Sequence, residues 1–355
     1  MLPAASLNIC FTLTLGGVGG LAFYFLGAPA PFMLGSMLVC WCVGASIRRT
    51  RPYFSTPWPL RFGVVSIVAV VLGSYATPDA IQGMLSWWPS LLALAIASLL
   101  VTWLSYFFLR SRGYDDVVAW LSAQPAGLSE IVAMATRYTD KDYFVAFFHL
   151  VRVSTVFLFV PLLVWFVASD FDTQVVPQGQ VRSWQVDWWI WPQFALIALF
   201  GSLIGRVARL PMSMLLGPML LTAVLSGMGF LEWQRPFELI CLVQVVLGAS
   251  IGGRMGQVEF RTLWSAVPDA YLNAFGIIFV SFAAALGIAL LIDEEVLKIF
   301  LAFSPGGVTE LSLIAVALGY EVAFITLHHL FRMAVVMFAM PFKALPAPKN
   351  ARPPG

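Results

Sequence analysis

The sequence predicts an all-α polytopic membrane protein built from two inverted repeats, each with five transmembrane helices and one re-entrant helical hairpin. Three observations lead to this fold class. Hydrophobic residues make up 60% of the 355 and charged residues only 11%, whereas a soluble domain has roughly 25% charged residues. One polar motif occurs twice at the same spacing, and the basic residues gather in alternate loops, which orients the chain in the membrane.

Most apolar segments are long enough to span the hydrocarbon, which takes about 20 residues. The first is expected to be a membrane helix and not a removed signal peptide, because no basic region precedes it. Two segments, 115–137 and 295–318, are interrupted at mid-length by proline and glycine, leaving arms of about 10 residues, or half a membrane. The segments are about 4–26, 31–48, 60–77, 88–109, 115–137, 143–169, 186–208, 211–230, 236–253, 263–292, 295–318 and 321–346.

The loop charges favour hairpins over kinked spans for the two interrupted segments. With two hairpins, ten spans remain, both termini are cytoplasmic, and the external loops are mainly acidic. If the first interrupted segment spanned the membrane, with or without the second, Arg206, Arg209, Arg254 and Arg261 would lie outside. The cytoplasmic basic residues of the hairpin topology are Arg48, Arg49, Arg51, Arg61, Arg110, Arg112, Arg137, Lys141, Arg206, Arg209, Arg254, Arg261, Lys343, Lys349 and Arg352.

Five spans and one hairpin make an odd number of crossings, so the second half would be inserted upside down relative to the first. The halves also match in sequence: Pro29–Met37 with Pro211–Met219, Leu72-Gly73 with Leu247-Gly248, and Pro89 with Pro268. Inverted repeats with broken helices are typical of secondary transporters. The predicted division is a first repeat 1–169, an external linker 170–185, a second repeat 186–346 and a cytoplasmic tail 347–355.

The duplicated motif reads Gln124-Pro125-Ala126-Gly127-Leu128-Ser129-Glu130 and then Ser304-Pro305-Gly306-Gly307-Val308-Thr309-Glu310. A His follows each Glu by 19 positions and an Arg by 22. A helix break leaves carbonyls unpaired on one side and N–H groups unpaired on the other. In a bilayer these groups must be buried in protein or face water. Ser129 and Thr309 suit helix N-caps. The tips of the two hairpins, Pro125–Gly127 and Pro305–Gly307, could therefore each bind an anion at the N–H groups and a cation at the carbonyls and the Glu.

These features predict a substrate- and ion-binding site where the two tips meet. Arginines would hold an anionic group such as a carboxylate, and Glu130 or Glu310 would take the coupling proton or sodium ion. The alternative is structural: the breaks merely allow a turn, and each Glu pairs with an Arg. The candidate residues are Pro125, Gly127, Ser129, Glu130, Arg152, Pro305, Gly306, Gly307, Thr309, Glu310 and Arg332.

Further candidates lie beside this set. His149 and His329 precede the arginines by three residues on the same helix face, which suits a proton relay or, equally, a hydrogen-bonded packing residue. Asp269 and Asn273, just after Pro268, are candidates for a cation site. No metal site and no cofactor are expected, because the three histidines and four cysteines lack ligand or disulfide spacing.

The duplicated proline-to-Leu-Gly segment, the Leu-Gly pairs and the two proline-glycine-glutamate blocks resemble the AbrB membrane protein family over essentially the whole chain. The resemblance implies a multi-pass protein of the bacterial inner membrane, and a transporter of poorly known substrate. Some members of that family are labelled transcriptional regulator, from a genetic effect, and others "ammonia monooxygenase".

The expected function is secondary transport of a small anionic solute by alternating access, coupled to a proton or sodium ion. A channel, or a membrane protein with an indirect effect on gene expression, is the alternative. An enzyme is not expected, since a copper monooxygenase needs a His-rich metal cluster. Direct nucleic-acid binding is not expected either, because the polar stretches are short loops. The remaining partners would be the lipid bilayer and a second copy of the chain, which could hold one half still during transport.

Overall fold

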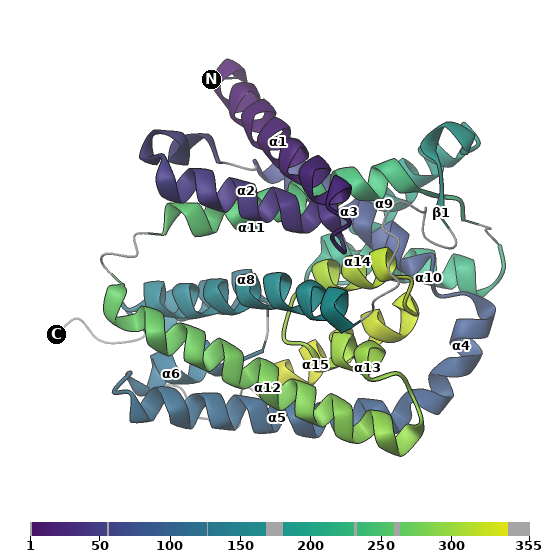
Figure 1. The fold of residues 1–355 in the computed structure, drawn as a ribbon. Helices are drawn as coiled ribbons and strands as arrows, with labels where there is room; N and C mark the ends of the chain where they lie inside the picture. The colour runs from purple at the N-terminus through teal and green to yellow at the C-terminus, as the bar shows by residue number, and fades with distance from the viewer. Residues whose placement is uncertain are drawn as a thin grey trace. The chain divides into compact units, whose positions relative to one another are not determined.

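A computed structural model describes residues 2–54, 57–125, 127–167, 180–230, 233–258 and 263–339 (Figure 1). Helices dominate these ranges, and the strands β1 (Gln180–Val181) and β2 (Arg235–Pro236) pair in parallel. The described chain divides into two compact units that alternate along the sequence. The first unit comprises Met1–Ser86, Pro161–Val258 and Ser312–Thr326, and the second unit comprises Trp87–Val160, Glu259–Leu311 and Leu327–Gly355. Most of the predicted linker and all of the predicted tail lie outside the described residues.

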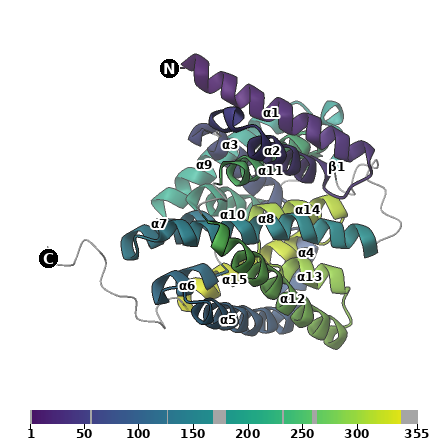
Figure 2. The same ribbon diagram turned by 60° about the vertical axis from the view of Figure 1, so that its left-hand side comes forward.

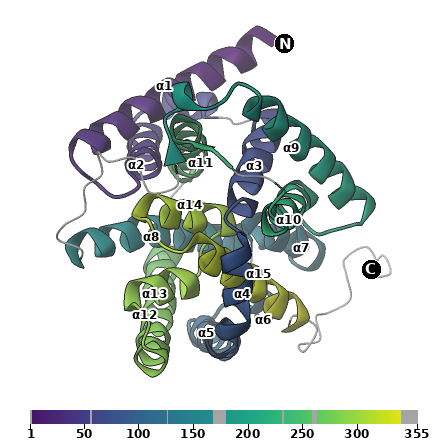
Figure 3. The same cartoon turned by 90° about the vertical axis from the view of Figure 1, so that its right-hand side faces the viewer.

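The first unit is built from two helix groups. Helix α2 packs against α1 and α11, while α10 packs against α9 and α3 (Figures 1 and 3). Its α-helices are α1 (Leu2–Phe25), α2 (Pro31–Ser46), α3 (Trp58–Gly73), α4 (Pro78–Met84), α9 (Ile190–Val207), α10 (Ser213–Gly227) and α11 (Phe237–Gln257). Short 3₁₀ turns are η1 (Arg48–Tyr53), η2 (Leu85–Trp87, crossing into the second unit) and η3 (Ser183–Gln185).

Glycines set the closest helix contacts of the first unit. A Cβ on Gly35 of α2 would lie 2.1 Å from the carbonyl oxygen of Gly19 in α1. A Cβ on Gly217 of α10 would lie 2.0 Å from the carbonyl oxygen of Gly201 in α9. Such distances mean backbone against backbone, the packing that small residues allow in membrane helices. The same crossing therefore occurs in both halves of the chain, at positions where the sequences match.

The second unit is organised around two long helices, α5 (Trp88–Ser111) and α12 (Val267–Ile292), which pack side by side (Figure 2). Two contacts show that they run in opposite directions, since each joins the end of α5 to the start of α12. The hydroxyl of Ser105 donates to Oδ1 of Asn273 at 2.8 Å, and Arg112 contacts Asp269. Helix α6 packs against α5, and α13 packs against α12. The remaining helices are α6 (Asp116–Ala123), α7 (Leu128–Tyr138), α8 (Asp142–Val167), η4 (Trp264–Ala266), α13 (Val296–Phe303), α14 (Val308–Leu318) and α15 (Val322–Ala339), of which α8, α14 and α15 continue into the first unit.

Both predicted interruptions are confirmed. Helix α6 ends at Ala123 and α7 begins at Leu128, and helix α13 ends at Phe303 and α14 begins at Val308. Proline lacks the N–H that a continuing helix requires, which explains why each helix stops just before it. Whether each segment returns to the side it entered stays a prediction.

Within the part of the chain that the structure describes, six helices are long and apolar enough to cross a membrane: Asn8–Phe25, Pro78–Ser111, Asp142–Leu163, Ile190–Val207, Phe237–Gln257 and Trp264–Ile292. They indicate a membrane protein. The other four predicted spans, α2, α3, α10 and α15, are short, with 15 to 18 residues. At 1.5 Å per residue such a helix is about 24 Å long, shorter than the roughly 30 Å of hydrocarbon.

Candidate functional site

Arg332 of α15 closes the second helix break. Its side chain is buried, with 2% of the residue exposed. Nη1 donates to the carbonyl of Ser304, and Nη2 donates to the carbonyl of Gly306 at 2.7 Å. These main-chain oxygens lie just past the end of α13, where a helix leaves its last carbonyls unpaired. The forked guanidinium thus satisfies in one step the polar groups that the proline and glycines expose.

The start of α14 is shaped by its glutamate. The hydroxyl of Thr309 donates to Oε2 of Glu310 at 2.6 Å, and a Cβ on Gly307 would lie 2.0 Å from the same oxygen. The carboxylate therefore folds back over Gly307, where a Cβ would displace it. The N-cap prediction is wrong for both Thr309 and Ser129, because α14 begins at Val308 and α7 begins at Leu128, which places both residues inside their helices. Ser129 and Glu130 stand in the equivalent first turn of α7, and their side chains lie outside the described residues.

Glu310 and Arg332 do not form the simple ion pair that charge complementarity would suggest. The carboxylate takes the Thr309 hydroxyl, and the guanidinium takes two carbonyl oxygens. The carbonyls of this tip are therefore engaged by a protein cation, and a bound cation would have to displace it. A buried carbonyl without a donor costs about 1–3 kcal/mol, which is the physical reason for this choice of partners.

His149 of α8 closes the first break in a related way. Its Nε2 lies 3.2 Å from the carbonyl oxygen of Gln124, and its Nδ1 lies 3.0 Å from that of Val145. A neutral imidazole carries a single N–H, so it can donate to one of these oxygens at a time. Arg152, one turn along α8, is buried with 2% exposure, and it repels Arg332 electrostatically. The two arginines of the motif therefore lie within electrostatic reach of each other.

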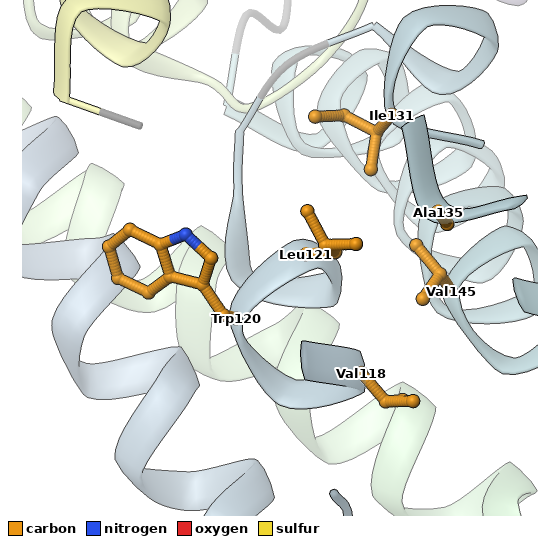
Figure 4. Close-up of a cluster of buried hydrophobic side chains, with 6 residues drawn as sticks. All are labelled: Val118, Trp120, Leu121, Ile131, Ala135 and Val145. Carbon is orange, nitrogen blue, oxygen red and sulfur yellow. The ribbon is translucent and has the colours of Figure 1, made fainter. Parts of the chain in front are cut away.

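Apolar packing holds the arms of the first broken segment. Val118, Trp120 and Leu121 of α6, Ile131 and Ala135 of α7, and Val145 of α8 form one buried cluster. Figure 4 shows Leu121 and Ile131 pointing toward each other across the gap between α6 and α7. Because residues on three helices share this cluster, the short arms need not be stable alone.

The prolines of both motif copies line one small cavity. Pro125 and Pro305 lie in its wall together with Arg332 and Phe303. Ser98 of α5 and Ser281 of α12 complete its polar lining, and each serine comes from the middle of a long helix. The cavity measures about 10 Å³, which is room for about one water molecule. The structure thus brings three of the predicted residues to one place and adds two serines.

The sequence model of the family described as "Transition state regulatory protein AbrB" matches residues 32–345. The chain belongs to the AbrB family. A Bacillus subtilis (strain 168) protein named "Uncharacterized protein YhjN" is 23% identical over 351 residues, which cover 93% of this chain and 90% of that protein. An Escherichia coli (strain K12) protein named "Putative regulator AbrB" is 25% identical over 358 residues, or 97% of each chain. The family match includes both broken segments.

The histidines of α15 occupy separate environments in this AbrB-family protein. His328 lies with Nε2 2.8 Å from the hydroxyl of Ser90, and its ring is 6.4 Å from that of Phe303. His329 is fully buried near the carbonyl of Leu301, but neither ring nitrogen reaches hydrogen-bond geometry. His149 and His329 each sit beside their own arginine. The structure describes no hydrogen-bonded chain from one to the other.

Asp269 and Asn273 lie one turn apart on α12 but contact different partners. Asp269 accepts from Nε of Arg112 at 2.7 Å and from the hydroxyl of Tyr114 at 3.1 Å. Burial raises the pKa of Tyr114, and this hydrogen bond raises it further. Asn273 accepts from Ser105. Asp269 therefore already has a cation of the protein, and it borders a second cavity of about 310 Å³ that Lys141 also lines.

Side chains outside the duplicated motif also lie near the tips. In the described ranges no three His, Cys, Asp or Glu side chains gather where they could hold a metal ion. Two residues that the motif did not indicate, Ser98 and Ser281, border the region of the tips, and His328, four residues before Arg332, lies beside Phe303. A single serine in an apolar helix belongs to no sequence motif. Only the position of Ser98 and Ser281 near the middle of a long apolar helix could have identified them as candidates.

Proposed function

We propose that this AbrB-family protein is a secondary transporter of a small anionic solute, working by alternating access with a proton or sodium ion as the coupling ion. The observation that carries the proposal is the cavity bordered by Pro125, Pro305 and the buried Arg332. Helices broken near a shared central site are the common device of secondary transporters, since free helix ends supply partial charges there. A buried guanidinium beside those ends favours an anion.

The internal symmetry of the packing supports two related repeats. Helices α1 and α2 cross as α9 and α10 do, α2 packs on α11 as α10 packs on α3, and α5 packs on α6 as α12 packs on α13. Each compact unit therefore contains matching elements from both halves of the chain. The inverted orientation of the second repeat rests on the loop charges.

Topology is the first test of the inversion. With hairpins at 115–137 and 295–318, the segment 170–185 should face the outside of the inner membrane, and the termini should face the cytoplasm. Fusions of a phosphatase and of a fluorescent protein after residue 178 and after residue 355 would report the side of each. A cytoplasmic signal from position 178 would overturn the hairpin topology.

Two other functions compete with transport. The name of the Escherichia coli relative favours a role in regulation, which an altered metabolite pool could produce without direct DNA contact. A channel could also use helices that break within the membrane. Purified protein in liposomes distinguishes these possibilities: a transporter gives saturable uptake driven by a proton or sodium gradient, a channel gives flux that does not saturate in the same range, and an indirect regulator that moves no solute gives neither.

Coupling should depend on Glu310. Glu310→Gln keeps the size of the side chain and its contact with Thr309, but it removes the site for a proton or sodium ion. We expect folded protein whose gradient-driven uptake falls by a factor of about 10 or more and no longer varies with pH. Uptake would be measured in liposomes with an anion that raises the melting temperature of the wild type.

The matched control for Glu310→Gln is Asp79→Asn, which removes an exposed carboxylate from the first turn of α4. This control should transport like the wild type. If a monodisperse Glu310→Gln protein also transported normally at every pH, the carboxylate would be structural and the coupling mechanism would be wrong.

A further inference from the structure

The polar residues that line the tip cavity, Arg332, Ser98 and Ser281, can all donate hydrogen bonds. Arg332 uses Nη1 and Nη2 for the carbonyls of the second break, but its buried Nε–H has no hydrogen-bond partner among the described residues. Ser98 and Ser281 also line the cavity, and these residues are 5% and 4% exposed. Neither hydroxyl bonds to another side chain or carbonyl that the structure describes.

A guanidinium can only donate, and a hydroxyl can donate or accept. The Nε–H of Arg332 therefore requires an acceptor, and an acceptor with several lone pairs can also accept from both hydroxyls. The charge points the same way, because no described carboxylate lies within salt-bridge distance of the buried Arg332. A carboxylate group meets both requirements: it is anionic and has about four acceptor positions.

The rest of the wall is apolar. Leu94, Ala97 and Val101 of α5 and Phe303 of α13 surround the three donors, together with the two prolines. A second charged group would have to be buried against these side chains, which is strongly unfavourable. With room for about one water, the cavity has to expand before it can admit an organic acid, so a short chain is favoured over a long one.

We propose that the solute is a short-chain monocarboxylate, whose carboxylate is held by the Nε–H of Arg332 and the hydroxyls of Ser98 and Ser281 while its apolar end packs against α5 and Phe303. This inference rests on the proposed transport function and names the substrate class of the same site. It assigns Ser98 and Ser281 as specificity-determining residues of the central helices α5 and α12.

Equilibrium binding tests the assignment without any need for transport. Propionate, succinate and inorganic phosphate would each be titrated into purified full-length protein at pH 7 by calorimetry, with melting temperature as a second readout. We expect propionate to bind and to stabilise the protein more than succinate or phosphate. Ser98→Ala and Ser281→Ala should each weaken propionate binding by a factor of about 10, as expected for one hydrogen bond to a charged group.

Ser122→Ala is the matched control, because Ser122 is a buried serine of α6 that does not line the cavity. Its affinity for propionate should equal that of the wild type. Unchanged affinity in Ser98→Ala and Ser281→Ala, no binding of propionate, or tighter binding of succinate or phosphate would overturn the monocarboxylate assignment.

The two proposals fail separately. If succinate or phosphate binds more tightly and is taken up along a gradient, transport stands and the substrate class is wrong. If propionate binds through Arg332 and the two serines but no gradient drives its uptake, the site stands and the transport function fails.

Discussion

Gly217→Val should leave almost no folded protein in the membrane. The new side chain would begin 2.0 Å from the carbonyl oxygen of Gly201, and this oxygen belongs to a backbone that cannot rotate away. Overpacking of a core usually costs about 1–3 kcal/mol, but in this case α9 and α10 would have to separate, so the loss should exceed that range. A fluorescent-protein fusion analysed by size-exclusion chromatography would show aggregate or no peak.

The control for this effect lies on helix α1. Gly19→Val should fail in the same way, since its Cβ would lie 2.4 Å from the carbonyl oxygen of Gly35. Gly17→Val, two residues earlier, should be tolerated because nothing lies within 4 Å of its Cβ. If Gly217→Val and Gly19→Val ran as monodisperse peaks with the melting temperature of Gly17→Val, the glycine crossings would not be what holds the first unit together.

The helix ends that proline and glycine determine were predictable from the sequence. Proline and glycine act on the residue where they stand, so the ends of α6 and α13 and the starts of α7 and α14 could be placed to within a residue or two. The all-helical architecture was likewise predictable, because it follows from the hydrophobic composition. The glycine crossings at Gly35 and Gly217 fall inside the segments that match between the halves.

Contacts between residues that are distant in the sequence were not predictable. The structural alternative paired Glu310 with Arg332, but the guanidinium donates to the main-chain oxygens of Ser304 and Gly306, which no sequence pattern indicates. Ser98 and Ser281 reach one cavity only because α5 and α12, which are far apart in the sequence, pack against each other. The division into two units that each draw on both halves also depends on packing between distant segments.

Arg332→Lys should keep the fold and the charge but loosen the second break. A lysine carries one compact ammonium group and cannot present a fork to the carbonyls of Ser304 and Gly306. One of these buried oxygens would lose its donor at a cost of about 1–3 kcal/mol. The amide of Gly306, which donates to Ser304 at 2.9 Å, should then open more often. Hydrogen–deuterium exchange of the peptide covering 304–307 should be faster by a factor of about 10, given about 1.4 kcal/mol of lost local stability.

Transport should suffer more than stability from the same change, because Arg332 lines the cavity and the substitution also removes its buried, unpartnered Nε–H. We expect gradient-driven uptake to fall by a factor of about 100, as is typical when a group that positions a substrate is displaced by about 1 Å. Arg206→Lys in α9 is the matched control, since Arg206 is exposed near the end of its helix. That variant should show wild-type exchange and uptake. Wild-type exchange at 304–307 together with wild-type uptake in Arg332→Lys would mean that a point charge is sufficient and that neither the break nor the substrate requires the guanidinium fork.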